Sequence, residues 1–436
     1  MSDSGHAAAD LRTEYLVNPL GIGERRPRLS WVIESGRRGV RQTAYRIVAG
    51  SSREHVARGV GDRWDSGWVV SRAPGQIAYE GSPVAARERV WWAVRVRDDA
   101  GTESTWSEPA FWETGLIPTD WTSATGSERS EWKASWVSLP GLVPAPEVAK
   151  AREWDGLVPA PYFRAVFATG GGIVRANLYV TARGVYEAHL NGEVVGDRTL
   201  DPGWTDYNRR IQYQAFDVTN TVRDGENVLG AIVAPGWYAG YVGFGPQCRH
   251  YGTTPQLLMQ LHLELADGTE NVITTGDAWR ASIGAIRYGD LLLGEHVDAR
   301  HHPAGWDAPG FDDRGWQPVA VAGIGAVPIV ASVAEPVREQ ETISPVSVTE
   351  YQPGVWIIDL GQNIAGRIHL TARGEAGTEV RLRHGEMLNE DGSLYTENLR
   401  GPYAEDTFIL AGTAGDETFA PRFTWHGFRY VDHRLS

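Results

Sequence analysis

Hydrophobic and polar residues alternate in short runs along the first part of the chain. Between residues 90 and 98 aromatic and β-branched residues recur at every second position, and a turn signal follows at 99–101. A second run of this kind occupies residues 106–112. A period of two is typical of strands with one buried face. We therefore expect a fibronectin type III-like β-sandwich over residues 1–117, with a short helical stretch near 54–60.

The alternation stops between residues 118 and 161. This stretch is first rich in Ser and Thr and then carries five prolines between residues 140 and 161. Such a composition favours extended or irregular backbone. We interpret residues 118–161 as a linker leading into the next domain, with a small helical candidate at 147–153.

A larger β-domain is predicted over residues 162–328. Strands are expected at 176–182 and 185–190, and Asn191-Gly192 after the second strand is a strong signal for a type I′ hairpin turn. Antiparallel strands in this number predict a jelly roll.

The last part of the chain, residues 329–436, also alternates. Its strands are expected near 355–360, 379–384 and 423–431, and helical periodicity over twelve or more residues is not found in the sequence. The prediction is therefore an all-β chain, with a fibronectin type III-like sandwich followed by two jelly-roll or β-sandwich domains.

Composition supports this fold class and raises one functional question. The 436 residues include 51 Gly, 24 Pro and 18 Trp, and Gly and Pro punctuate short strands. Trp side chains stack on sugar faces, although packing inside and between the domains is the plainer explanation for so many.

The charge balance excludes several classes of partner. The formal net charge is −14, whereas nucleic-acid binding needs a basic surface that neutralises phosphates. The same charge disfavours anionic membranes and polyanionic substrates. A neutral ligand such as a glycoside fits better.

Cysteine usage and the absence of targeting signals predict a cytoplasmic protein. Cys248 is the only cysteine, so the sequence holds neither an internal disulfide framework nor a multi-cysteine zinc site. The first residues show no basic segment followed by an apolar one, and no run reaches the eighteen apolar residues of a membrane span.

Ordered sequence blocks in all three predicted domains resemble those of bacterial α-L-rhamnosidases. The first domain carries NPLGI (18–22) and PRLSW (27–31). The second carries LDPGWTDY (200–207), GWYAG (236–240) and GEHVDAR (294–300). The third carries DLGQNIAG (359–366), HGEML (384–388) and FTWHGFRYV (423–431). Each block alone is weak, but their order and spacing together are specific.

This resemblance implies a glycoside hydrolase that removes terminal α-L-rhamnosyl residues with inversion and without a cofactor. It also implies that the catalytic acid and base lie in a helical (α/α)₆ barrel after the last block, where this sequence has five more residues. We therefore expect a non-catalytic N-terminal part and assign no catalytic residue.

Two other functions remain open. The chain could be a stand-alone carbohydrate-binding protein, or it could be the assembly partner of a separately encoded catalytic domain. The expected partners are rhamnosides or other neutral carbohydrates, the helical domain and, as a further outlet for an exposed apolar face, a second copy of the chain.

The candidate binding residues lie in the second domain. Asp201 and Asp206 stand beside Trp204 and Tyr207, an acidic and aromatic cluster that could hold a sugar or, more simply, cap turns and pack between domains. The GWYAG block and the glycine-rich aromatic loop at 241–251 add a second group of candidates for carbohydrate binding or a domain interface, which consists of Trp237, Tyr238 and Tyr241.

No metal site is predicted. The densest polar stretch includes Glu295, Asp298 and the neighbouring His301 and His302. Adjacent histidines in an extended strand point to opposite faces, so ion pairing is the better interpretation of this stretch. The acidic turn at 312–313 leaves a calcium role open without a specific motif for it.

Overall fold

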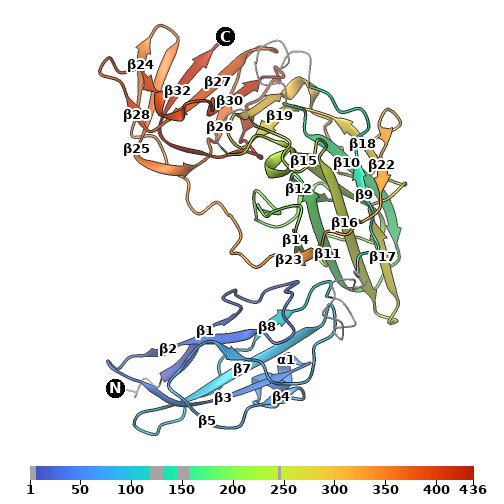
Figure 1. Cartoon of the computed structure of the whole chain (residues 1–436), viewed down its shortest axis with the longest axis vertical. Coiled ribbons are helices and arrows are strands. Elements are labelled where there is room, and N and C mark those ends of the chain that lie inside the picture. Colours follow the sequence, from blue (N-terminus) through green and yellow to red (C-terminus); the bar gives the residue numbers. More distant parts are fainter. Residues whose placement is uncertain (1–5, 118–130, 145–156, 244–246) are drawn as a thin grey trace. The chain divides into compact units, whose positions relative to one another are not determined.

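The computed structural model describes residues 6–117, 131–144, 157–243 and 247–436. The chain divides into two compact units, Met1–Trp132 with Val330–Glu335 and Lys133–Ile329 with Pro336–Ser436 (Figure 1). Each unit is described by itself. The helical candidate at 147–153 lies outside the described residues.

The first unit is a β-sandwich. One sheet has the order β1-β2-β6, and the other has the order β4-β3-β7-β8 with β5 paired to β3 (Figure 1). The strands and the short helix are β1 (His6–Thr13), β2 (Arg28–Ser35), β3 (Gln42–Gly50), α1 (Arg53–Ala57), β4 (Trp64–Asp65), β5 (Val69–Val70), β6 (Ile77–Ala78), β7 (Arg89–Asp98) and β8 (Ala110–Glu113). The alternation at 90–98 places Trp92, Val94 and Val96 in the core with no exposed surface, as the period of two predicts.

The second unit begins with a larger sandwich of two antiparallel sheets. Their orders are β13-β12-β15-β10-β18-β21 and β22-β9-β16-β11-β14, with β17 paired to β16. The strands are β9 (Trp136–Ser138), β10 (Pro161–Thr169), β11 (Ile173–Arg183), β12 (Val185–Leu190), β13 (Glu193–Val194), β14 (Ile211–Asp217), β15 (Gly225–Ala234), β16 (Gln256–Leu265), β17 (Glu270–Thr274), β18 (Arg280–Ile283), β21 (Gln317–Pro318) and β22 (Ala320–Ala322). A short helix, α3 (Gly236–Ala239), follows β15.

Long apolar side chains from both sheets form the core of this sandwich. Leu178, Leu229, Leu261 and Trp279 are at most 1% exposed, and burial of each such side chain contributes roughly 1.5–3 kcal/mol. The hairpin predicted at Asn191 is confirmed, because Asn191 and the glycine after it both have positive φ, 55° and 88°, and join β12 to β13.

The C-terminal part of the second unit is built on a sheet of order β19-β20-β30-β27-β32-β25-β24 (Figure 1). Two small sheets, β26-β31 and β28-β29, accompany it. The elements are β19 (Ile286–Asp290), β20 (Gly294–Asp298), η1 (Ala299–His301), β24 (Ser347–Gln352), β25 (Val355–Gly366), β26 (Leu370–Ala372), β27 (Glu379–Gly385), β28 (Met387–Leu388), β29 (Leu394–Tyr395), η2 (Glu397–Leu399), β30 (Glu405–Ile409), β31 (Glu417–Phe419) and β32 (His426–Leu435). The remaining strand, β23 (Ile329–Ala331), lies where the chain passes between the two units.

Two strands from the range expected for the second domain belong to this last sheet. β19 pairs with β20, and β20 runs parallel to β30, with His296 opposite Thr407. A buried apolar cluster reinforces the connection, because Tyr162 of β10 and Phe423 are both members of it. The jelly-roll part and the C-terminal part therefore share a buried core.

Strands dominate the described residues, and the helices among them are single turns or little more. The prediction of an all-β chain is therefore confirmed. Within the described part, no helix has both the length and the apolar character needed to cross a membrane.

Candidate functional site

A large bulge in the C-terminal sheet carries the DLGQN block. β25 pairs regularly with β32 from Val355 to Asp359, and the pairing resumes at Ile364, opposite Phe428. Residues 360–363 of β25 therefore oppose only Arg429 of β32. Arg429 holds the start of the bulge, because its Nε and Nη2 donate to the two carboxylate oxygens of Asp359 at 2.8 and 2.9 Å.

Glycine is required inside this bulge. Gly361 has φ +79°, and a Cβ there would lie 2.9 Å from Cγ1 of Val346. The left-handed conformation and the close approach explain why the block has Gly at this position. A bulge changes the direction of the side chains beside it. In this bulge, Leu360 and Gln362 line a groove.

The groove has a volume of about 770 Å³. Four segments of the second unit form its walls: residues 199–200, helix α3, the extended segment at 337–345, and the C-terminal sheet. The lining residues are Thr199, Leu200, Trp237, Val337, Arg338, Glu339, Gln340, Glu341, Thr342, Ile343, Pro345, Ile358, Leu360, Gln362, Ile364, Ala365, Gly366, Arg367, Ile368, His369, Leu370, Leu382, Thr424, Trp425 and Phe428. Most of them are apolar, as is usual in sites for small molecules.

Most of the charged side chains that line the groove are paired with each other or with a neighbour. Arg367 donates through Nε to Oε1 of Glu339 at 2.9 Å, and Nε2 of His369 lies 3.3 Å from the same oxygen. The hydrogen bond and charge of Arg367 lower the pKa of Glu339. Arg338 donates through Nε to Oδ2 of Asp197 at 2.7 Å. These pairs offset each other's charge, and the exposed side chain of Glu341 adds one more carboxylate to the wall.

Of the residues predicted from the sequence, only Trp237 lines the groove. It follows Gly236, whose φ of +49° starts helix α3. A Cβ on Gly236 would lie 2.2 Å from Cγ2 of Val185. The GWYAG block therefore combines a glycine required by close packing with an aromatic side chain beside the groove.

The predicted acidic and aromatic cluster at 201–207 is divided between the interior and the surface. Asp201 is buried and accepts from Arg198, and burial raises the pKa of its carboxyl. Trp204 is 56% exposed. Asp206 is also exposed and accepts the backbone N–H of Asn208 at 3.0 Å, which is a turn-capping contact.

The predicted tyrosines are largely interior residues. Tyr207 is buried, and its hydroxyl donates to the carbonyl of Gly203 at 3.1 Å. Its ring packs 5.4 Å from the ring of Tyr238. Tyr241 is also buried, and its backbone N–H donates to the carboxylate of Asp290. Their role in binding a carbohydrate stays a prediction.

A buried polar network joins β12 of the jelly roll to the C-terminal part of the same unit. His189 of β12 contacts Asp307 through Nδ1 at 2.7 Å and Glu187 through Nε2 at 3.0 Å. Arg422 reaches the same carboxylate of Glu187 through Nε at 3.1 Å. Its backbone N–H and that of the next residue donate to Oε2 of Glu295 at 3.1 and 3.0 Å.

Burial changes the protonation of this network. Desolvation raises the pKa of Glu295 to about 7, against the opposing charge of Arg422. Burial lowers the pKa of His189, but the hydrogen bonds that its ring donates to the carboxylates of Asp307 and Glu187, together with their charges, outweigh burial and raise the pKa overall. The network links β12 to residues 295, 307 and 422, so we assign it to the joining of the two β-domains.

The rest of the predicted polar stretch forms ion pairs. Arg300 donates to both carboxylate oxygens of Asp298 at 2.8 and 2.7 Å, and Asp298 caps η1 through the N–H of Arg300. In the acidic turn, Asp312 accepts the backbone N–H of Arg314 at 3.1 Å. These contacts agree with the interpretation as ion pairs and turns.

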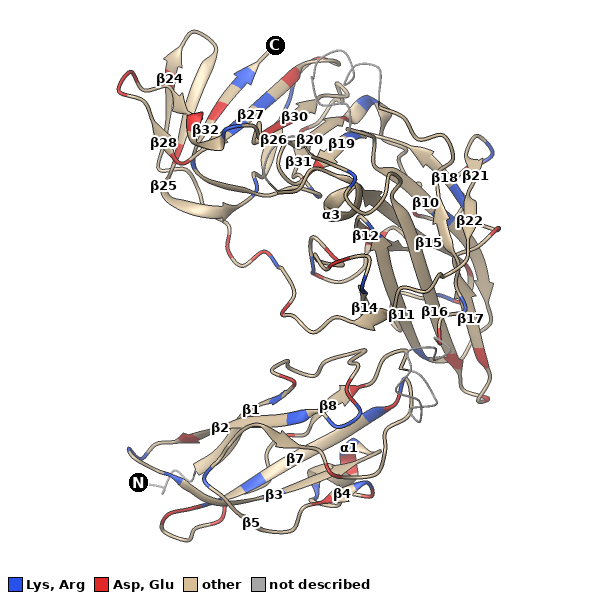
Figure 2. Ribbon diagram, in the orientation of Figure 1, with Lys and Arg blue, Asp and Glu red and all other residues tan. Residues whose placement is uncertain are grey.

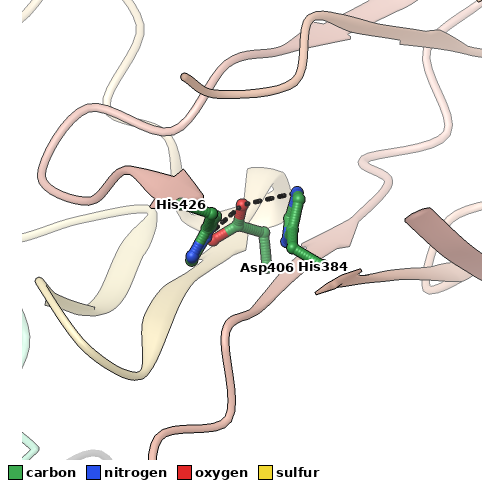
Figure 3. A group of neighbouring side chains, drawn as sticks. All are labelled: His384, Asp406 and His426. Carbon is green, nitrogen blue, oxygen red and sulfur yellow. Dashed lines mark hydrogen bonds and ion pairs between the residues drawn. The ribbon is translucent and has the colours of Figure 1, made fainter. Parts of the chain in front are cut away.

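One histidine cluster escaped the sequence prediction. His384 of β27, Asp406 of β30 and His426 of β32 meet inside the C-terminal sheet (Figure 3), with ligand atoms within 4.8 Å of one another. Nδ1 of His384 contacts the carbonyl of Ala404 at 2.9 Å, so Nδ1 carries the proton and Nε2 the lone pair. Burial lowers the pKa of His384 to about 3, so the ring stays neutral. Asp406 bonds Nε2 of His426 at 3.1 Å.

The ring geometry argues against a shared metal ion. The rings of His384 and His426 are stacked, with centroids 4.1 Å apart and planes 19° from parallel. A metal ion binds an imidazole nitrogen near the ring plane at about 2.0–2.1 Å, so two stacked rings cannot direct their lone pairs at one ion. We interpret the cluster as a hydrogen-bonded part of the core.

Family models match the chain in three consecutive segments. An immunoglobulin domain at the N-terminus of Rha78A-like proteins matches residues 8–118, the α-L-rhamnosidase N-terminal domain matches 171–341, and the bacterial α-L-rhamnosidase concanavalin-like domain matches 349–433. The chain belongs to the bacterial α-L-rhamnosidase family. The first β-sandwich is accordingly matched by an immunoglobulin-type model, and the fibronectin type III assignment stays a prediction.

Individual α-L-rhamnosidases agree with this assignment. The α-L-rhamnosidase of Streptomyces avermitilis is 37% identical to this chain over an alignment of 580 positions. The alignment covers 96% of this chain and 55% of the relative. That of an Alteromonas species is 34% identical and covers 96% of this chain and 44% of the relative. The chain therefore spans about half the length of the relatives it matches.

Solved structures of the family have the same fold. The crystal structure of the S. avermitilis α-L-rhamnosidase complexed with L-rhamnose superposes with a TM-score of 0.88 at 35% identity, covering 99% of this chain and 56% of that one. The α-L-rhamnosidase from Dictyoglumus thermophilum gives 0.85 at 34% identity, covering 100% of this chain and 47% of that one.

Proposed function

We propose that this chain is the non-catalytic β-domain part of an α-L-rhamnosidase whose complete form hydrolyses terminal α-L-rhamnosyl residues from glycosides with inversion. The observation that carries the proposal is the ordered match of three family domains between residues 8 and 433. The shared buried core of the jelly-roll part and the C-terminal part supports the proposal that they act as one unit.

Two acidic residues, Glu339 and Glu341, line the groove, and the first of them is held in an ion pair. An inverting enzyme needs one carboxylic acid and one carboxylate about 6.5–9.5 Å apart, on either side of the scissile bond. Glu339 in the groove wall is held by Arg367, which lowers its pKa and removes it as a proton donor at neutral pH. We therefore place the acid and base of the complete enzyme in the helical barrel that the resemblance implies.

Surface charge supports a neutral substrate. Figure 2 shows Lys and Arg positions interspersed with Asp and Glu positions along the ribbon of the described residues. Together with the net charge of −14, this supports a neutral glycoside over nucleic acid or an anionic membrane. The single cysteine, Cys248, supports a cytoplasmic location.

The non-catalytic part of the proposal is tested with the purified chain and p-nitrophenyl α-L-rhamnoside. We expect no release of p-nitrophenol above the blank, with the S. avermitilis relative as the positive control. Rapid turnover by the pure chain would contradict the proposal.

The rhamnosidase part is tested by assembly. The C-terminal part of the S. avermitilis relative is fused after Ser436 and compared with the same part alone. We expect the fusion to hydrolyse the rhamnoside at least tenfold faster, because the β-domains support the catalytic part. A folded fusion without this gain would count against the assignment. Two other assemblies are tested separately: a helical domain supplied as a separate chain by mixing the two purified parts, and a homodimer by the mass of the chain in solution.

A further inference from the structure

We propose that the groove over the DLGQN bulge binds an extended peptide segment, which adds as a strand to the free edge of β25. The segment carries apolar residues at alternate positions and a basic residue, and it belongs to the part of the complete enzyme that this chain does not span. This inference rests on the proposed function and adds a docking surface to it. It requires a free strand edge, an apolar wall and a complementary charge.

The part of β25 after Asp359 has a strand neighbour on one side only. β24 pairs with Val355–Asp359, and its last ladder contact is the backbone N–H of Val346, which donates to the carbonyl of Asp359 at 2.8 Å. Beyond this point, β25 pairs with β32 alone among the described strands. Alternate N–H and C=O groups of a strand point to opposite sides. About half of those in residues 362–366 therefore face the side without a strand neighbour.

A proline explains why this edge is free. If β24 extended further in its register, residues 341–345 would lie opposite residues 361–365 of β25. Pro345 has no N–H for a ladder, and the segment at 337–345 forms the opposite wall of the groove instead. The groove therefore lies between β25 and a segment that would otherwise be its neighbour. At about 3.3 Å per residue, the free edge has room for a strand of about six residues.

The walls of the groove offer apolar contacts to one face of such a strand. Ile358 and Ile364 line it from β25, and Ile343 lines it from the opposite segment. Trp425, just before β32, also lines it and keeps 47% of its surface exposed. Apolar surface beside a free strand edge promotes pairing with other chains unless a segment of the protein covers it. Every second side chain of the docked segment would pack against this wall.

The charge of the wall favours a basic residue in the segment. Arg367 is bound to Glu339, and Arg338 is bound to Asp197. Glu341 is exposed on the same wall, and no described residue forms an ion pair with its carboxylate. A Lys or Arg of the segment would complete this pair. Exposed pairs contribute little affinity, but they select the register and the partner.

The complete enzyme has enough further chain to supply the segment. The matched region covers 55% of the S. avermitilis relative and 44% of the Alteromonas relative, so each has roughly as much chain again outside it. A segment of the same chain binds at a high effective concentration, so weak affinity as a free peptide is sufficient. The net charge of −14 also favours a basic segment over an acidic one.

The test uses overlapping peptides of about twelve residues from the part of the S. avermitilis relative outside the matched region. Binding to the full chain is measured by fluorescence anisotropy, and we expect one region to bind with a dissociation constant of about 10–100 µM. Ala365→Arg, at an exposed position of the free edge, should weaken binding at least about tenfold. Ala322→Arg is its matched control, because Ala322 is an exposed strand residue that does not line the groove.

The charge is tested in the same assay. Glu341→Gln should weaken binding about threefold and reduce its dependence on salt. Glu390→Gln, which removes an exposed carboxylate outside the groove, should bind as the wild type does. Equal effects of the two substitutions would contradict the role of Glu341.

Backbone methylation tests the addition of a strand. The bound peptide is prepared in two forms, with N-methyl groups at its odd or at its even positions. Only one form should lose binding, because every second N–H faces β25. Hydrogen exchange of the amides at 362–366 should slow in the complex. Equal binding of both forms would show that side chains alone hold the peptide and would refute strand addition.

The outcomes separate this inference from the proposed function. Peptide binding that Ala365→Arg leaves unchanged would overturn the groove as the docking surface. Absence of binding by every peptide up to about 1 mM would overturn it as well, while the fusion experiment would still decide the rhamnosidase assignment. Self-association of the chain that Ala365→Arg abolishes, without peptide binding, would overturn the proposed source and assign the edge to a second copy of the chain.

Discussion

The buried carboxyl of Glu295 should make the second unit less stable as the pH rises. Its pKa is 4.5 as a free side chain and about 7 in the fold, because desolvation opposes its charge. Below the lower value the carboxyl is protonated in both folded and unfolded chains. Between the two values it ionises only in the unfolded chain, so stability falls as the pH rises through this window.

The substitution Glu295→Gln isolates this effect. The amide imitates the protonated carboxyl and keeps an oxygen for the N–H groups of Arg422 and Phe423, which Oε2 of Glu295 now accepts. The difference between 4.5 and about 7 corresponds to about 3 kcal/mol. We expect the variant and the wild type to be nearly equal near pH 4.5 and the variant to be more stable by about this amount at pH 8.

Urea unfolding at both pH values measures the difference. The two units can unfold separately, so the transition of the second unit is identified as the one that Phe428→Ala shifts. Phe428 is fully buried in the C-terminal sheet. The exposed residue Glu390 supplies the matched control, because Glu390→Gln keeps Glu295 and should lose stability with rising pH as the wild type does. Other buried groups, such as His384, titrate in both proteins and cancel. An equal difference between variant and wild type at both pH values would refute the reasoning.

Two further predictions concern single contacts. Asp406→Asn should lower the free energy of unfolding of the second unit by about 2 kcal/mol in urea, because a buried charge-assisted hydrogen bond is lost. Zn²⁺ should leave the melting temperature of the wild type unchanged. A rise in melting temperature with zinc would show that the stacked histidines do share an ion. Gly236→Ala should cost about 1–3 kcal/mol in thermal or urea unfolding, since the added Cβ would lie 2.2 Å from Val185 Cγ2 at a φ of +49°. Gly276→Ala is its control, because nothing lies within 4 Å of a Cβ there, and equal losses in both variants would contradict the steric explanation.

Local patterns were enough to predict the fold class and the family. A period of two reports which strand face is buried, so the alternation at 90–98 identified β7 without any contact being known. The Asn191-Gly192 turn was equally predictable, because both residues accept the positive φ that a tight hairpin needs. The ordered family blocks depend only on the order of residues along the chain.

The candidate site could not be predicted in the same way. Sequence neighbours of Trp204 suggested a single acidic and aromatic cluster, but the fold buries Asp201 and Tyr207 and leaves Trp204 at the surface. Only the aromatic character of the GWYAG and FTWHGFRYV blocks could have indicated Trp237 and Trp425 as neighbours of one groove.

The sequence by itself therefore determined the all-β architecture, the order of the domains and the family. Tertiary structure alone decided that residues near 200, 237, 340, 362 and 425 line one groove. It also decided that β20 joins the C-terminal sheet beside β30 and that His384, Asp406 and His426 meet in its core. The physical reason is that these contacts join segments tens to hundreds of residues apart, and strand pairing over such distances depends on the packing of the whole unit, which no local period records.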